Sequence, residues 1–494
     1  MLALYAGTFH YPRVFDDLTY VPSVGAGLHR WLADETFRWI GPHLAAERLA
    51  NVVLHGATAI VLFGFLQRLF RAVLADARGM AFFGALAFAL HPVAVYGVAY
   101  LTQRSIIMAT LFSIAALWCV LEGLLRQFLR WHLAAAALYF LAVISKEHAV
   151  MLPAVAVAMA LLLRGTPLYQ LRYVLILMAL AAAATVYRAR TLIGSAYEPF
   201  AQDIGALAYS LSIINQGYLF FRYLVTWLIP CPCWMSIDLR VGFPHELLAW
   251  PQTLGFIGFL AYPIVAFLLL RRRGAMGLAG LGLLYPWLLA LTEFATIRAQ
   301  EPFVLYRSYL WMSGLPIALP ALLPAKGRPA LLIVGCLVLA VLARERIETF
   351  SDPLKLWDDA VRKNTDLRAP YVERAYINRG ELHRGAGRAS LALADFDRAI
   401  ALNPRIAEGY VGRATLRLEL RQPHEALPDL QRAVELEPNH ASARAKRCYA
   451  KSQMAYPAAD VLADCEAARK LAPADPEIRD IDAAVRRRLG VTSR

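Results

Sequence analysis

The stretch Phe15-Asp16-Asp17-Leu18 places two adjacent carboxylates near the start of the chain, just after a short apolar run. The sequence that follows, up to about residue 343, consists mostly of apolar runs that suit membrane helices. Carboxylates beside a bilayer are costly unless they have partners or a chemical task. This contrast predicts a membrane helix bundle organised around a polar site, with Asp16 and Asp17 on its extracytoplasmic side.

The composition divides the chain of 494 residues into two parts. Hydrophobic residues make up 59% of it, more than in an ordinary soluble domain, and they are concentrated before Ala343. The remainder is charged and typical of helices. We therefore predict an all-α protein with a transmembrane domain at 1–345 and an extracytoplasmic domain at 346–494. Many of the Lys and Arg residues behind the net charge of +14 lie between apolar runs, where they set topology and do not indicate nucleic-acid binding.

The apolar runs predict about eleven membrane helices. The first run, Met1 to Val14, is shorter than the roughly 20 residues that a span needs, so we expect a short first helix or a start upstream of this sequence, and favour the latter. The stretch 207–229 contains Asn215, Gln216 and Arg222 and is predicted to be interfacial or re-entrant. The other runs lie near residues 45–67, 79–99, 105–125, 132–145, 148–163, 173–187, 252–270, 275–292, 309–323 and 329–343.

Five basic junctions between these runs set the predicted orientation. They contain Arg68, Arg71 and Arg78; Arg126 and Arg130; Arg164 and Arg172; Arg271, Arg272 and Arg273; and Lys326 with Arg328. If 207–229 does not span, all five lie on one side, which the excess of positive charge makes cytoplasmic. The first loop, the loop 188–251 and everything after Ala343 then lie outside.

Polar residues from several separate segments are predicted to meet on this outer side. Besides Asp16 and Asp17 they are His91, Gln103, Arg104, Ser145, Lys146, Glu147, His148, Asp238, Glu293, Arg298 and Arg307. Structural explanations stay open for some: a helix end for His91, an interfacial side chain for Arg104, and mutual pairing for Lys146 and Glu147. The convergence of cations and carboxylates at one membrane depth favours a functional site.

Such a set suits the transfer of a sugar from a lipid phosphate. Arg and Lys bind the anionic phosphate and stabilise it as it leaves, while a carboxylate accepts the proton of an attacking hydroxyl. A single displacement would invert the sugar carbon. The sequence contains neither the P-loop nor the G-x-G-x-x-G fingerprint of nucleotide sites.

Several motifs, taken in order, resemble the transmembrane-and-TPR O-mannosyltransferase family and its bacterial relatives, which are GT-C glycosyltransferases. They are Phe15-Asp16-Asp17, His91-Pro92-Val93 with Gln103-Arg104, Ser145-Lys146-Glu147-His148, the segment 228–238, and Tyr306-Arg307-Ser308-Tyr309-Leu310. The resemblance covers nearly the whole chain. It implies a polyprenyl- or dolichyl-phosphate sugar donor, a protein acceptor and a catalytic acidic pair in the first outer loop. Tyr306 in place of the family's acid, Gln103 and the short first run depart from the pattern and leave the donor sugar open.

These observations assign roles to individual residues. Asp16 is the predicted base, with Asp17 as its neighbour or substitute, and Arg104, Lys146 and Arg307 are the predicted ligands of the donor phosphate. The predicted supporting residues are His91, Gln103, Glu147, His148 and Asp238. No metal ligand or certain cofactor is predicted, although two adjacent carboxylates leave a divalent metal undecided.

A tetratricopeptide period follows the last apolar run. Tyr376, Gly380, Ala392, Phe396, Ala399 and Pro404 match the repeat's positions, and an offset of 34 gives Tyr410, Ala414, Ala426, Leu430, Ala433 and Pro438. A third unit slips by one residue and ends at Ala468 and Pro473, and 475–490 is predicted to be a capping helix. Such a solenoid has a groove for a peptide or partner, which we favour over a spacer role.

The chain has six cysteines. Cys448 and Cys465 lie on the facing helices of the third unit; if the tail is extracytoplasmic, a disulfide between them and two packed thiols are equally open. A bridge within Cys231-Pro232-Cys233 would be strained, so pairing with another chain and two free thiols are equally open.

The sequence therefore predicts a GT-C-type glycosyltransferase of the bacterial inner membrane with its TPR domain in the periplasm. It would move a sugar from a polyprenyl-phosphate carrier to a Ser or Thr of an acceptor protein bound by the TPR groove. One alternative is transfer to a lipid or polysaccharide. Another is a non-enzymatic, membrane-anchored TPR scaffold for envelope or pilus assembly, which would not need the polar set.

Overall fold

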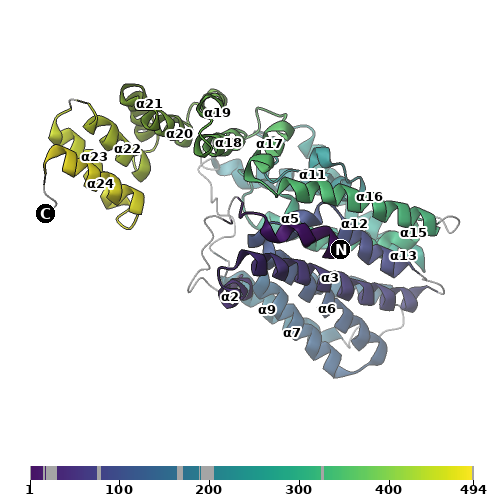
Figure 1. Ribbon diagram of the computed structural model, residues 1–494. Helices are drawn as coiled ribbons and strands as arrows, with labels where there is room; N and C mark the ends of the chain where they lie inside the picture. The colour runs from purple at the N-terminus through teal and green to yellow at the C-terminus, as the bar shows by residue number, and fades with distance from the viewer. Residues whose placement is uncertain are drawn as a thin grey trace. The chain divides into compact units, whose positions relative to one another are not determined.

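The computed structural model is all-helical over the residues that it describes (Figure 1). These are residues 2–14, 17, 30–74, 79–163, 171–188, 190, 205–323, 328–454 and 456–491. The chain divides into two compact units, Met1–Leu356 and Trp357–Arg494. This division lies eleven residues beyond the boundary predicted at 345, because α16 (Arg328–Thr349) and the start of α17 (Pro353–Lys363) belong to the first unit.

The first unit is a helix bundle whose longest helix is α3 (Leu44–Val73). Helix α3 packs against α6 (Arg104–Arg126), which in turn packs against α7 (Leu129–Ser145) (Figure 1). The other α-helices of this unit are α1 (Leu2–Tyr5), α2 (Trp31–Ile40), α4 (Met80–Leu90), α5 (Ala94–Val98), α8 (Leu152–Leu162), α9 (Arg172–Arg188), α11 (Ala208–Leu228), α12 (Gln252–Leu270), α13 (Ala275–Ala290), α14 (Ser308–Met312) and α15 (Leu319–Leu322). Between them lie short 3-10 turns, which hold several of the polar residues.

Four helices of the described part are long and apolar enough to cross a membrane. They are Leu44–Val73, Leu101–Arg126, Gln252–Leu270 and Ala275–Ala295. The prediction of about eleven membrane helices is therefore not confirmed, because several apolar runs form shorter helices. The run 79–99 breaks at His91-Pro92 into α4 and α5, and the run 309–323 contains Pro316 and Pro320 and forms only short helices. Proline removes a backbone donor and ends or kinks a helix.

One end of the bundle, called here the polar end, collects the start of α3 and the ends of α4, α7 and α13. Contacts between them join these parts: His55 of α3 hydrogen-bonds to Tyr309 and to the Ala89 carbonyl near the end of α4, and Glu293 after α13 pairs with Arg307 and with His148 after α7. The sequence-distant polar residues of the first unit thus lie at the same end.

The opposite end carries the basic junctions that follow α3, α6 and α12. Glu122 accepts hydrogen bonds from both Arg68 and Arg126, which joins the far ends of α3 and α6. The junction 271–273 lies at this end too, since Gly274 approaches Leu74 just beyond α3. This segregation agrees with the topology that the basic residues predict.

Helix α11 runs unbroken through the stretch predicted to be interfacial or re-entrant. Near its start, the Ser212 hydroxyl accepts a hydrogen bond of 2.8 Å from the Arg298 amide. Near its end, Trp227 donates to the Ser308 hydroxyl at 2.9 Å, and its carbonyl lies 3.0 Å from Nε2 of His91. Both ends of α11 therefore contact loops of the polar end.

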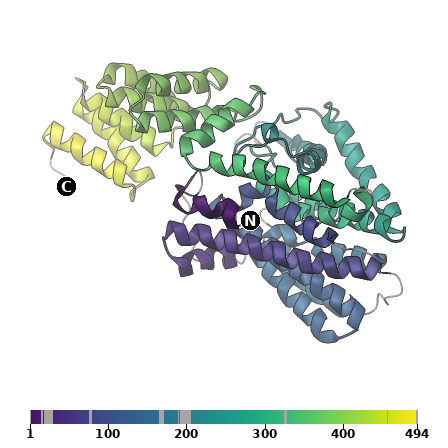
Figure 2. The same ribbon diagram turned by 45° about the vertical axis from the view of Figure 1, so that its right-hand side comes forward.

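The second unit consists of helix pairs with the predicted period (Figure 2). The pairs are α18 (Glu373–Gly385) with α19 (Ala389–Leu402), α20 (Ala407–Glu419) with α21 (Pro423–Leu436), and α22 (Ala441–Ser452) with α23 (Ala458–Leu471); α24 (Pro476–Leu489) follows. At the predicted small and aromatic positions, Ala392, Phe396 and Ala399 are fully buried, and Phe396 packs directly on Gly380. A larger side chain at Gly380 would collide with this ring, which explains the small residue.

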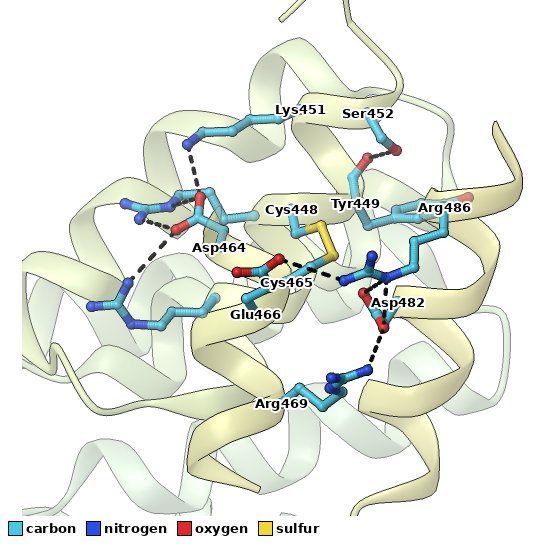
Figure 3. Close-up of a disulfide and its surroundings, with 12 residues drawn as sticks. Cys448, Tyr449, Lys451, Ser452, Asp464, Cys465, Glu466, Arg469, Asp482 and Arg486 are labelled. Carbon is cyan, nitrogen blue, oxygen red and sulfur yellow. Dashed lines mark hydrogen bonds and ion pairs between the residues drawn. A yellow bond between two sulfur atoms is a disulfide. The ribbon is translucent and has the colours of Figure 1, made fainter. Parts of the chain in front are cut away.

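An ion pair between a half-buried Arg and a buried Asp recurs in every repeat and extends the predicted pattern. Arg379 clamps Asp395, Arg413 clamps Asp429, and Arg447 clamps Asp464, each through two guanidinium nitrogens. The third pair is offset by one residue, as the slipped repeat requires. In the same repeat, Cys448 and Cys465 form a disulfide between α22 and α23 (Figure 3).

Candidate functional site at the polar end

Asp17 fixes the first loop to the start of α6. Its side chain is 2% exposed, and its two oxygens accept hydrogen bonds from the amides of Thr102 (2.9 Å) and Leu101 (3.3 Å). A carboxylate at a helix N-terminus satisfies free N–H groups and complements the helix dipole. Burial raises the pKa of Asp17 to about 6, although these amides and Arg48 act in the opposite direction. Its partner in the predicted pair, Asp16, lies outside the described residues.

A cavity of about 360 Å³ opens beside Asp17. It is lined by Arg13, Asp17, Phe37, Arg38, Gly41, Pro42, Glu47, Leu101 and Thr102. Arg13 donates two hydrogen bonds to Glu47, at 2.8 and 2.9 Å, so the two charges on this wall of the cavity form an ion pair. The volume lies within the range of small-molecule sites, roughly 300–1,000 Å³, and the lining combines an aromatic face with polar groups.

The position of Arg104 does not favour its predicted role as a phosphate ligand. The side chain is fully buried and lies over the ring of Phe37 at 3.7 Å. Its three nitrogens donate to the Asn51 amide oxygen, the Thr36 hydroxyl and the Glu47 carbonyl. A phosphate would have to replace these bonds, so Arg104 instead holds α2 and α3 against α6.

Two supporting residues also make structural contacts. His91 is the residue at the C-terminal end of α4, and its ring stacks on that of Trp227 with ring centres 4.1 Å apart. Its Nδ1 accepts a hydrogen bond from the Val93 amide. Burial lowers the pKa of His91 to about 3, which keeps the ring neutral. Gln103 donates to the Thr102 hydroxyl at 3.3 Å, while its carbonyl oxygen is buried without a partner in the described part of the chain.

Lys146 is the outstanding cation of the polar end. It follows α7, is 3% exposed, and its ammonium forms no hydrogen bond or ion pair with any described residue. Burial lowers the pKa of Lys146 to about 7, and the charges of Arg30, Arg307 and Arg298 add to this effect against Glu147. A buried ammonium without a partner is costly, so this position favours an anionic ligand.

Glu293 connects the residues around Lys146. One of its oxygens lies 2.7 Å from Nε2 of His148, and the other lies 3.5 Å from Arg298 and 3.6 Å from Arg307. Arg307 also donates to the Glu301 carbonyl at 2.8 Å. The structure thus brings together three residues of the predicted site, namely Lys146, His148 and Arg307.

Glu147 lies beside this cluster. Its carboxylate approaches His148 at 3.5 Å. Burial alone would raise its pKa, but Lys146, His148 and Arg30 hold the pKa of Glu147 well below the ordinary value. Glu147 is therefore an anion that faces Lys146 without forming a close ion pair with it.

Asp238 pairs with Arg240, a residue that was not among those predicted from the sequence. Its carboxylate lies 2.6 Å from Arg240, both side chains are buried, and Arg240 also donates to the Gln300 carbonyl. The opposite charges two positions apart were the available signal. This pair fixes the loop after α11 against the loop before α14.

Two tyrosines link the cavity beside Asp17 to the charged residues around Lys146. The amides that bind Asp17 directly follow Tyr100, whose ring packs edge-on against Tyr306 at 5.9 Å, and Arg307 is the next residue. The two parts of the candidate site are therefore neighbours within one end of the bundle.

The polar end also holds a disulfide between Cys231 and Cys233, whose Cα atoms lie 5.2 Å apart, within the ordinary range of about 4.4–6.8 Å. The sequence left pairing with another chain and free thiols open; the structure instead joins these two cysteines. Among the described residues no group of three His, Cys, Asp or Glu side chains could hold a metal ion.

No family model matches this chain, and no curated protein matches it. Among solved structures, it is similar to the crystal structure of the APC/C hetero-tetramer Cut9–Hcn1. The identity is 13% over 83% of this chain and 84% of that chain, with a TM-score of 0.27. A likeness at this score carries no argument, so the helix pairs described above rest on their own geometry.

Proposed function

We propose that this protein is a membrane glycosyltransferase that moves a sugar from a polyprenyl-phosphate carrier to a hydroxyl of a protein. One observation carries the proposal: the buried ammonium of Lys146, which forms no hydrogen bond or ion pair with a described residue, lies in a group of cations at the polar end, near the Asp17 cavity. A lipid phosphate at the membrane surface would supply the missing negative charge.

The proposed reaction is a single displacement. The acceptor hydroxyl forms the new bond to the anomeric carbon as the bond between that carbon and the donor phosphate oxygen breaks. The hydroxyl proton passes to the carboxylate of Asp16, and the lipid phosphate leaves with its electron pair. Lys146 and Arg307 stabilise the charge on the leaving phosphate, and Asp17 holds the loop that carries the base.

Two further features support an extracytoplasmic site and a protein acceptor. Both disulfides, Cys231–Cys233 at the polar end and Cys448–Cys465 in the helix-pair unit, suit an oxidising compartment such as the periplasm. The helix pairs provide a surface of the kind that binds peptides and partner proteins. We therefore assign acceptor binding to the second unit.

The test uses membranes that contain the full chain. Intact-mass analysis compares envelope proteins made with the wild-type chain, with Asp16→Asn, with Lys146→Gln and without the chain. The proposal expects a mass increment of one sugar that needs both residues and is unchanged by Glu348→Gln, an exposed control with the same kind of charge change. Equal masses in all samples would refute protein glycosylation, and an increment on lipid or polysaccharide alone would change the acceptor.

A further inference from the structure

We propose that Arg298 is an additional anion-binding residue of this site and that Glu293 is a positioning residue, which holds Arg298 and Arg307 beside Lys146. The ligand class is a phosphoryl anion, whether it belongs to a polyprenyl phosphate or is free phosphate. The inference rests on the proposed function for its place in a reaction, but its binding part can be tested without any transfer.

The contacts of Glu293 are those of a positioning group. Its carboxylate is almost fully buried and divides its two oxygens between His148 on one side and the two arginines on the other. The distances to Arg298 and Arg307, 3.5 and 3.6 Å, are those of ion pairs and exceed normal hydrogen bonds. Glu293 therefore draws both guanidinium groups to one place without using up their hydrogen-bond donors.

Arg298 differs from its neighbours in exposure. Its side chain is 24% exposed, whereas those of Arg307 and Glu293 are 8% and 3% exposed. Its backbone amide is anchored to the Ser212 hydroxyl at the start of α11. Within the described part of the chain, Glu293 is the only side chain that pairs with its guanidinium. Arg298 thus has a fixed backbone and a partly exposed guanidinium whose N–H groups a ligand can reach.

The charges around Lys146 leave room for one more anion. Lys146, Arg298 and Arg307 are cations, and Arg30 also acts on Lys146. The carboxylates that oppose these cations are Glu293, which the two arginines share, Glu301, which lies 3.9 Å from Arg307, and Glu147, which faces Lys146 and His148. A phosphoryl group between Lys146 and Arg298 would receive donors from two chain segments, as charge-assisted recognition of phosphate requires.

The binding test uses the full chain in detergent with farnesyl phosphate as probe, farnesol as its uncharged analogue, and inorganic phosphate as competitor. We expect Arg298→Gln to weaken farnesyl phosphate binding about tenfold or more, the range for a lost hydrogen bond to a charged group. Arg344→Gln, an exposed arginine that contacts the Leu4 carbonyl, is the matched control and should bind as the wild type does. Competition by inorganic phosphate would identify the phosphoryl group as sufficient; competition by farnesol alone would overturn the proposal.

Glu293→Gln tests positioning through kinetics. A positioning role predicts a raised KM for the lipid donor with kcat nearly kept, and Arg298→Lys should restore part of the affinity lost in Arg298→Gln. Unchanged KM and binding in folded Glu293→Gln and Arg298→Gln would overturn the proposal. If Glu293→Gln does not fold, Arg298→Gln decides alone.

The two proposals fail separately. A wild-type chain that transfers sugar while Arg298→Gln keeps the wild-type KM would leave the function standing without this inference. A wild-type chain that binds farnesyl phosphate through Arg298 but transfers no sugar would leave the anion site standing without the function.

Discussion

Asp17 accepts a hydrogen bond of 2.9 Å from the amide of Thr102, a residue far along the chain at the start of α6. This contact ties the loop with the acidic pair to the first long helix of the bundle that follows α4. Both oxygens of Asp17 accept hydrogen bonds from backbone amides, which favours a structural role for this residue. Asp16 then remains as the proposed base.

The stability of the first unit should depend on pH through Asp17. Burial raises the pKa of this group from 3.8 to about 6, so the folded state holds the proton more tightly than the unfolded state. The contribution to stability is then fully present below pH 3.8 and is lost as the pH rises to about 6. Thermal unfolding in detergent should show this loss for the wild type and a smaller one for Asp17→Asn. Identical pH profiles would contradict the assignment.

Anion binding should weaken above neutral pH because of Lys146. Since the pKa of this group is lowered to about 7, it is charged at pH 6 and largely neutral at pH 8.5. Affinity for farnesyl phosphate should fall over this interval in the wild type. Lys146→Arg stays charged at both values and should keep its affinity, which separates the effect from the titration of the phosphate. A parallel fall in both proteins would count against Lys146 as the ligand.

The repeated Arg–Asp clamp should stabilise the second unit. Asp429 is buried and pairs with Arg413 and Arg417, so Asp429→Ala should cost about 1–3 kcal/mol, as expected when charged groups lose their hydrogen-bond partner. Asp397 contacts the same Arg413 but is 58% exposed, and Asp397→Ala should cost less than about 1 kcal/mol. Hydrogen exchange of α20 and α21 in the full chain measures both. Equal effects would show that burial of the clamp is unimportant.

The cysteines should report the compartment of each part. Cells are alkylated before lysis, and their membrane proteins are then unfolded and alkylated again. Peptide mapping without reduction should find Cys231 linked to Cys233 and Cys448 linked to Cys465, with Cys119 alkylated after unfolding. Both linked pairs would place the polar end and the helix-pair unit in an oxidising environment. Four free thiols at these positions would contradict the proposed orientation.

The helix-pair unit could be predicted almost residue by residue, whereas the bundle could not. Its repeats place Gly380 and Phe396 in contact through local spacing, and a single sequence displays that spacing directly. In the bundle, contacts join residues far apart in the chain, so the sequence indicated which groups were polar but not their partners. It could not show that Arg104 donates hydrogen bonds to Thr36 of α2 and to the Glu47 carbonyl of α3.

Glu293 illustrates the same limit from the other side. It belonged to the predicted polar set but received no role, because nothing local shows that His148 and Arg307 reach it. The predicted number of membrane helices was not confirmed for a different reason. Apolar composition alone does not reveal where a proline such as Pro92 divides a run into two short helices.

The most direct test of the proposed function is sugar transfer by the purified full chain. A polyprenyl-phosphate sugar and a mixture of envelope proteins are supplied, and the acceptors are weighed by mass spectrometry. The account predicts a gain of one sugar mass that is abolished by Asp16→Asn and by Lys146→Gln and is kept by Glu348→Gln. Transfer that persists undiminished without the Lys146 charge and the Asp16 carboxylate would contradict it.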